Sequence, residues 1–179
     1  PRPAARQVTP GRILDAAAEE TGSALAAVNW QLHDFSARGM ASSEAGHASG
    51  AAHLLSFMGS DSLGSLDWIR RFYPSEAGTP NGQILGSIPA TEHAVMCAGG
   101  QENERDTFIR IMTQNPTGPV AAVSDTWNLW DVLLKLLPSL KDMIMGRDGK
   151  LVIRPDSGDP ADIICGTSTR PGAVFTAQV

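Results

Sequence analysis

Long apolar runs and basic clusters are both missing from this sequence of 179 residues. No apolar stretch approaches the roughly 18 to 20 residues that span a bilayer, and the amino end lacks the apolar core of a signal peptide. Fourteen basic and nineteen acidic residues give a net charge of -5, and the charges are scattered along the chain. This pattern argues against a nucleic-acid surface. We therefore expect a cytoplasmic globular protein that engages neither membranes nor nucleic acids.

Cysteine is scarce, and nucleotide-binding loops of the common kinds are absent. Cys97 and Cys165 show no metal-ligand spacing, so we expect two free thiols in a reducing compartment. The sequence contains no glycine-rich Walker loop and no dinucleotide fingerprint, which argues against those modes of nucleotide binding. The chain starts on Pro1 instead of methionine, which suggests that residues have been lost upstream.

Short apolar runs alternate with helical patterns from one end of the chain to the other. Apolar runs predict five strands, at residues 30–35, 53–58, 84–88, 120–123 and 151–154. Helical spacing and capping residues predict helices at residues 9–22, from Ser42 onward, at 62–72, 92–98, 102–114 and 127–137, and from Pro160 onward. Such alternation favours parallel strands joined by right-handed crossovers. The predicted fold class is α/β, with no boundary between domains.

The run 151–158 has the clearest functional pattern. A strand-length apolar segment leads directly to Arg154, Asp156 and Ser157, and Pro155 and Gly158 turn the backbone there. An ordinary exit from a strand into a turn would look similar. The same arrangement recurs after the other predicted strands, with Asp34, Asp61, Ser87 followed by His93, and Asp125. In a parallel barrel these strand ends share the face that carries catalytic sites.

Such a face could bind a divalent metal, a phosphate ester or the hydroxyls of a sugar. Mg²⁺ takes one or two carboxylates and completes its shell with water and substrate phosphate, so Asp125 and Asp156 are candidate partners, directly or through water. The simpler alternative is that each aspartate caps the helix that follows it. For Asp61 we favour this capping role.

Five ordered motifs carry a resemblance to a known family. They occupy residues 33–39, 57–61, 87–93, 123–125 and 153–158, and read HDFSARG, FMGSD, SIPATEH, VSD and IRPDSG. In order and spacing they resemble motifs of the nicotinamide phosphoribosyltransferase family. The resemblance implies a type II phosphoribosyltransferase with an irregular, parallel β/α barrel that is active as a homodimer. It also implies the reaction: nicotinamide and phosphoribosyl pyrophosphate combine, with Mg²⁺, to give nicotinamide mononucleotide and pyrophosphate for NAD salvage.

The resemblance also implies roles for individual residues. Asp34 would accept a hydrogen bond from the carboxamide of nicotinamide and so select the amide over the acid. Arg154 and Ser87 would lie near the base and the sugar, and Asp156 would hold ribose hydroxyls or water-bound Mg²⁺. His93 would be phosphorylated transiently by ATP, and Asp125 would orient its ring.

Family members are more than twice as long as this chain, and the resemblance runs from about Ala17 to Gly166. Residues 1–166 are therefore expected to form the central part of the catalytic barrel domain, and residues 167–179 an atypical tail, disordered or artefactual. Part of a barrel leaves strand edges unpaired, so we expect weak or absent turnover and a tendency to associate. Two alternatives stay open: a nicotinate phosphoribosyltransferase, which Asp34 would discriminate, and a non-catalytic remnant that only binds ligand.

Overall fold

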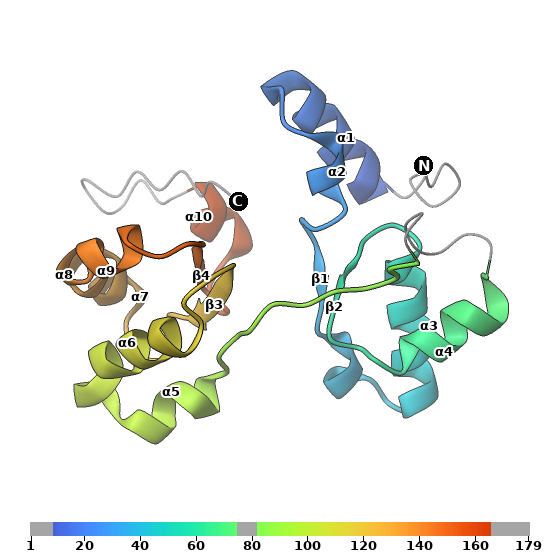
Figure 1. The fold of residues 1–179 in the computed structure, drawn as a ribbon. Coiled ribbons are helices and arrows are strands. Elements are labelled where there is room, and N and C mark those ends of the chain that lie inside the picture. Colours follow the sequence, from blue (N-terminus) through green and yellow to red (C-terminus); the bar gives the residue numbers. More distant parts are fainter. Residues whose placement is uncertain (1–8, 75–81, 166–179) are drawn as a thin grey trace. The chain divides into compact units, whose positions relative to one another are not determined.

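The computed structural model describes residues 9–74 and 82–165. The chain divides into two compact units, Pro1–Ser87 and Ile88–Val179, and each unit is described by itself. The tail predicted at residues 167–179 lies outside the described residues. Figure 1 shows the order of the elements.

Helices dominate the first unit, and its two strands are very short. The elements are α1 (Thr9–Thr21), α2 (Leu25–Val28), β1 (His33–Asp34), the 3-10 helix η2 (Ser36–Gly39), α3 (Ser43–Leu54), β2 (Gly59–Ser60) and α4 (Ser65–Phe72). Helices α3 and α4 pack side by side, and Leu54 and Ile69 are fully buried between them. Burying side chains of this size stabilises a fold by about 1.5–3 kcal/mol each.

Strands β1 and β2 pair in parallel, with His33 opposite Gly59 and Asp34 opposite Ser60. Gly59 also forms a parallel bridge with Gly86, so three segments lie next to one another. The strand predicted at residues 30–35 is shorter than expected because the N–H groups of Trp30 and Gln31 bond back to Ala27 and Val28. In the segment 84–88, where a strand was predicted, Gly86 forms an isolated bridge and no regular strand is assigned.

The strand predicted at residues 53–58 is wrong, because helix α3 continues through Leu54. The side chain of Ser42 caps α3 as predicted, accepting a hydrogen bond from the N–H of Ala45 at 3.1 Å. Leu54 extends the buried helical stripe that includes Ala51. A short apolar run fits the buried end of a helix as well as a strand, so periodicity alone could not separate them.

The second unit contains a parallel strand pair and, apart from one helix of 11 residues, short helical segments. Its elements are α5 (His93–Gly99), the 3-10 helix η3 (Gln101–Asn103), α6 (Glu104–Gln114), β3 (Val120–Val123), α7 (Leu129–Asp131), the π-helix η4 (Val132–Leu136), α8 (Leu137–Ser139), α9 (Lys141–Met145), β4 (Leu151–Arg154) and α10 (Pro160–Cys165). Except for the segment 127–137 and for α9, which was not predicted, these elements follow the sequence predictions to within a few residues.

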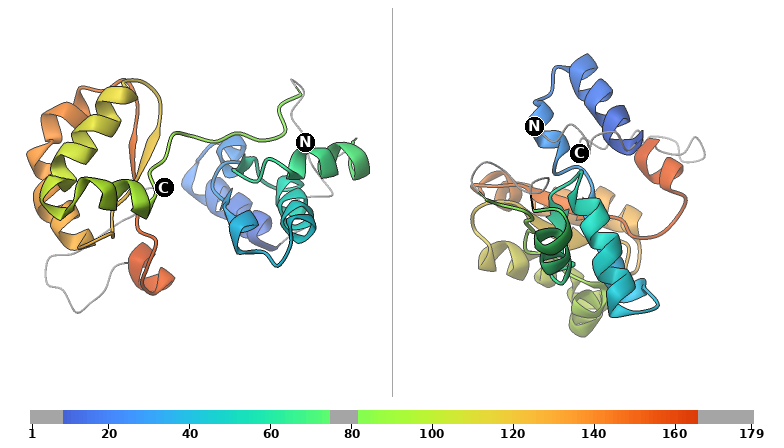
Figure 2. Two further views of the ribbon diagram at one scale, coloured as in Figure 1. Left: turned by 90° about the horizontal axis from the view of Figure 1, so that it is seen from below. Right: turned by 90° about the vertical axis from the view of Figure 1, so that its right-hand side faces the viewer.

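Strand β3 is buried along its whole length and pairs in parallel with β4. The register sets Val120 opposite Leu151 and Val123 opposite Arg154, and on the other side of β3 a parallel bridge joins Ala90 to Ala121. Helix α6 contacts β3, and the left-hand view of Figure 2 shows it beside the strand pair. The core contains Phe108, Met112, Ala122 and Val123, all at most 1% exposed, and the partly buried Ile153 packs against it.

The single amphipathic helix predicted at residues 127–137 is divided. Trp127 precedes the helical segment, and residues Val132–Leu136 form a π-helical turn between α7 and α8. Pro138 has no N–H with which to continue an α-helical ladder, and the turn before it is widened. Trp127 nevertheless packs against the core of the unit.

The described residues confirm an α/β chain whose four strands pair in parallel, as two sheets of two strands. Among these residues, no helix combines the length and the apolar character that crossing a membrane requires.

Two glycines in α3 give a matched test of the packing between α3 and α4. An added Cβ at Gly50 would overlap the hydroxyl of Ser65 and come to 3.0 Å from Asp34 Oδ2, whereas at Gly46 it would make ordinary contact with Ala37 at 3.4 Å. Gly50→Ala should therefore lower the free energy of unfolding by about 1–3 kcal/mol. Gly46→Ala should raise it by up to about 1 kcal/mol, because alanine favours helix. Urea denaturation of both variants measures the difference, and equal stabilities would contradict the packing described.

Candidate active site

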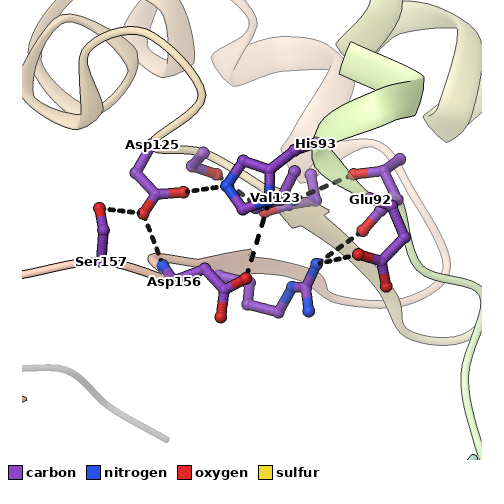
Figure 3. Close-up of polar contacts among 10 residues, drawn as sticks. Glu92, His93, Val123, Asp125, Asp156 and Ser157 are labelled. Atoms are coloured by element: carbon purple, nitrogen blue, oxygen red, sulfur yellow. Dashed lines mark hydrogen bonds and ion pairs between the residues drawn. The ribbon is translucent and has the colours of Figure 1, made fainter. Parts of the chain in front are cut away.

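Three segments of the second unit converge on the imidazole of His93. His93 is the first residue of α5, Asp125 follows β3, and Asp156 follows β4 (Figure 3). The register that sets Val123 opposite Arg154 carries the two aspartates to neighbouring positions two residues later. The bridge from Ala90 to Ala121 brings the segment before α5 to the same place. Pairing of parallel strands therefore assembles a site from residues more than sixty positions apart.

The imidazole of His93 lies between two carboxylates. Its Nε2 is 3.2 Å from Asp125 Oδ1, and its Nδ1 is 3.8 Å from Asp156 Oδ2. The side chain of Asp125 is only 5% exposed, whereas those of His93 and Asp156 are each 43% exposed. A ligand can therefore reach the histidine and Asp156, while Asp125 lies behind them.

Asp125 is held by donors from the loop after β4. Its Oδ2 accepts hydrogen bonds from the Asp156 backbone N–H at 2.7 Å and from Ser157 Oγ at 2.5 Å. Burial raises the pKa of Asp125, but these hydrogen bonds and the contact with His93 outweigh burial, so the pKa lies below its ordinary value. Asp125 is therefore ionised at neutral pH.

The negative charge of Asp125 determines which ring nitrogen of His93 carries no proton. An ionised carboxylate only accepts hydrogen bonds, so the Nε2 that faces Asp125 carries a proton. In the neutral ring Nδ1 then keeps its lone pair. Nδ1 is therefore the nitrogen of His93 that can act as a nucleophile.

Thr91 connects the histidine segment to both strands. Its buried Oγ1 accepts a hydrogen bond from the Val123 N–H at 3.0 Å, and its carbonyl accepts one from Arg154 Nη2 at 2.8 Å. The guanidinium of Arg154 also lies 3.7 Å from Glu92 Oε2. These contacts hold the side chain of Arg154, which is 16% exposed, against Thr91 and Glu92, the two residues that precede His93.

A second polar cluster surrounds Asp34 in the first unit. Asp34 is 8% exposed, and its Oδ1 accepts a hydrogen bond from the Ser36 N–H at 3.0 Å. Ser60 Oγ, on the neighbouring strand, lies 3.5 Å from Asp34 Oδ2. Burial raises the pKa of Asp34, but the nearby Ser62 hydroxyl, hydrogen bonding from Ser36 and electrostatic attraction to His53 outweigh burial, so the pKa lies below its ordinary value.

Asp61 does not cap α4, so the expected capping role is wrong. The helix begins at Ser65 with Gly64 before it, and the carboxylate of Asp61 lies 3.0 Å from His33 Nε2. The ring of His33 also stacks on Phe35 at 4.5 Å between centroids. No local pattern of residues indicates this pair, because a contact across 28 residues depends on the pairing of β1 with β2.

The structure thus brings four of the six predicted site residues together in the second unit: His93, Asp125, Asp156 and Arg154. The other two, Asp34 and Ser87, belong to the first unit, where Asp34 is buried and Ser87 is exposed. Sequence reasoning did not single out Thr91 or assign a role to Ser157. Both lie inside the quoted motifs, beside residues that were singled out.

The carboxylates of the site can hold Mg²⁺ only with help from water or substrate. No group of three or more His, Cys, Asp or Glu side chains among the described residues could enclose a metal. Both oxygens of Asp125 already accept hydrogen bonds, whereas Asp156 is half exposed. Mg²⁺ commonly binds through one carboxylate and completes its shell with water and phosphate oxygens, so Asp156 fits as the direct ligand.

Comparison with known proteins places the chain in a family. The profile of the nicotinate phosphoribosyltransferase (NAPRTase) family matches residues 30–172. The chain belongs to this family. Proteins with similar sequences include those named nicotinamide phosphoribosyltransferase from Acinetobacter baylyi, 43% identical over 162 residues, and from Mycoplasma pneumoniae, 39% identical over 153 residues.

The alignments with these two relatives cover 87% and 86% of this chain but only 31% and 30% of the relatives. The chain therefore spans less than a third of the length of either one. A third relative of the same name, from Xanthomonas campestris, is 38% identical over 139 residues.

Thr91 offers a test of how the second unit is assembled. Thr91→Val keeps the shape of the side chain but leaves the buried N–H of Val123 without its acceptor, so the free energy of unfolding should fall by about 1–3 kcal/mol. Amide hydrogen exchange at Val123 should also accelerate. Thr91→Ser keeps the hydroxyl and should preserve the protection of Val123, and equal protection in the valine variant would contradict the role of Thr91.

Proposed function

We propose that the chain is the central part of a nicotinamide phosphoribosyltransferase. In this reaction the ring nitrogen of nicotinamide attacks the anomeric carbon of phosphoribosyl pyrophosphate, and the bond to pyrophosphate breaks. The products are nicotinamide mononucleotide and pyrophosphate, as in NAD salvage. The observation that carries the proposal is the cluster of His93, Asp125 and Asp156 at the ends of parallel strands, in a chain whose relatives bear this name.

The proposed reaction builds positive charge on the sugar while an anion departs. Asp156, exposed at the edge of the cluster, is suited to bind ribose hydroxyls or Mg²⁺, directly or through water. Asp125 would contribute to the metal site through water, since its own oxygens are engaged. When bound, Mg²⁺ would neutralise charge on the pyrophosphate. The protein supplies mainly positioning and electrostatic stabilisation.

His93 is proposed to accept a phosphoryl group from ATP. A bond would form from Nδ1 to the γ-phosphorus, and the bond from that phosphorus to ADP would break. The proton on Nε2 stays in contact with the Asp125 carboxylate, which offsets positive charge on the ring during transfer. ATP is therefore a proposed co-substrate that stimulates synthesis.

Asp34 is proposed to select nicotinamide over nicotinate, with Arg154 and Ser87 near the base and the sugar. Because the pKa of Asp34 is lowered, its carboxylate is ionised at neutral pH, can accept a hydrogen bond from an amide and repels the nicotinate anion.

The intact enzyme is proposed to be a cytoplasmic homodimer with an irregular β/α barrel. The parallel pairing within each unit supports the barrel.

A nicotinate phosphoribosyltransferase is the second candidate, favoured by the description of the family profile that matches the chain. The relatives named for nicotinamide favour the first candidate. A non-catalytic remnant is the third, because the chain spans less than a third of those relatives.

Mass spectrometry of the reaction products tests the proposed activity. The chain is incubated with nicotinamide, phosphoribosyl pyrophosphate, Mg²⁺ and ATP, and slow formation of nicotinamide mononucleotide is expected. Asp156→Ala should abolish the product, because it removes the exposed carboxylate of the site. Folded protein that gives no product would support the non-catalytic reading, and product that persists in the variant would contradict the role of Asp156.

Ligand selection by Asp34 is tested by calorimetric titration, which does not depend on turnover. Asp34→Asn should reduce the preference for nicotinamide over nicotinate by at least about tenfold, because like-charge repulsion of the acid is removed. Asp61→Asn is the matched control, since it removes a neighbouring carboxylate that pairs with His33. An unchanged preference in Asp34→Asn would show that this assignment is wrong.

A further inference from the structure

We propose that Ser157 is a positioning residue, which fixes the carboxylate of Asp125 and thereby holds His93 in the form that carries its proton on Nε2. Its importance for the reaction rests on the proposed phosphorylation of His93. The geometric argument rests only on the contacts within the second unit.

The two oxygens of Asp125 have separate tasks. Oδ2 accepts from Ser157 Oγ at 2.5 Å and from the Asp156 N–H at 2.7 Å, while Oδ1 faces His93 Nε2 at 3.2 Å. A carboxylate oxygen offers two lone pairs. Both lone pairs of Oδ2 are thus engaged by the loop after β4, and Oδ1 is left for the histidine (Figure 3).

Two donors on one oxygen restrict the carboxylate more than one donor does. The terminal torsion of an aspartate is broad and nearly two-fold, so a carboxylate held at one point can rotate about it. The backbone N–H of Asp156 supplies one of the two hydrogen bonds that hold the Asp125 carboxylate. The Ser157 hydroxyl supplies the other, with the short distance typical of a hydrogen bond between a hydroxyl and an ionised carboxylate.

Ser157 has no comparable role in packing. It is exposed, in the turn after β4, and it is not among the residues of the hydrophobic core. Its contact with the buried Asp125 carboxylate is therefore what a substitution would remove. Loss of the hydroxyl frees a lone pair on Oδ2 and lets the carboxylate turn, so that Oδ1 no longer constrains the ring of His93.

Long-range nitrogen–proton NMR correlation of the 15N-labelled chain tests the proposal, at a pH where the imidazole is neutral. The signals of His93 are assigned by their disappearance in His93→Gln. The unaltered chain should show the proton on Nε2. In Ser157→Ala the ratio of the Nε2–H to the Nδ1–H form should fall about tenfold, which corresponds to about 1.4 kcal/mol.

Ser157→Thr is the matched control, because it keeps the hydroxyl and should restore the ratio. A ratio in Ser157→Ala equal to that of the unaltered chain would overturn the proposal. So would an unaltered chain with the proton mainly on Nδ1, a result that requires no variant and is independent of whether a variant folds.

Phosphorylation of His93 by ATP, followed by mass spectrometry, adds a functional readout. Its yield should fall in Ser157→Ala and return in Ser157→Thr. Absence of phosphorylation in the unaltered chain would count against the proposed function, while the NMR ratio would still decide the role of Ser157. A yield that falls equally in both variants would overturn the proposal.

Discussion

The in-register pairing of β3 with β4 is the constraint on which the candidate site depends. Because Val123 lies opposite Arg154, the chain leaves the two strands side by side, and Asp125 and Asp156 each follow two residues after this pair. The hydrogen bond from the Asp156 N–H to Asp125 Oδ2 then continues the contact between the strands beyond their ends. A slip of one residue would send alternate side chains to the opposite face and separate this cluster.

Hydrogen bonds within the protein, more than contact with solvent, keep the aspartates of both polar clusters ionised. Asp34 and Asp125 are the two buried aspartates of the predicted site, and burial alone would favour their neutral forms. In each case hydrogen bonding and a nearby histidine together outweigh burial and favour the charged form. Each cluster therefore presents a fixed negative charge, which can orient an imidazole in one unit and accept a hydrogen bond in the other.

The sequence predicted the elements that carry strong local signals. Pro160 and the buried run of residues 120–123 marked α10 and β3, and capping by Ser42 marked the start of α3. The predictions for residues 53–58 and for Asp61 failed because tertiary contacts decided them: Leu54 packs against Ile69, and Asp61 finds His33 across β1 and β2. The motifs identified the strand-end residues, but contacts such as that of Ser157 with Asp125 depend on register, which a single sequence does not reveal.

The hydrogen bond from Arg154 Nη2 to the carbonyl of Thr91 has a thermodynamic consequence. A ligand that draws the guanidinium away must break a bond to the segment that begins α5, whereas a ligand that leaves Arg154 in place preserves that bond. Occupancy near Arg154 and the arrangement of the histidine segment then share a coupling free energy. Such a linkage is reciprocal, so a modification of the histidine segment changes affinity at the arginine by the same factor.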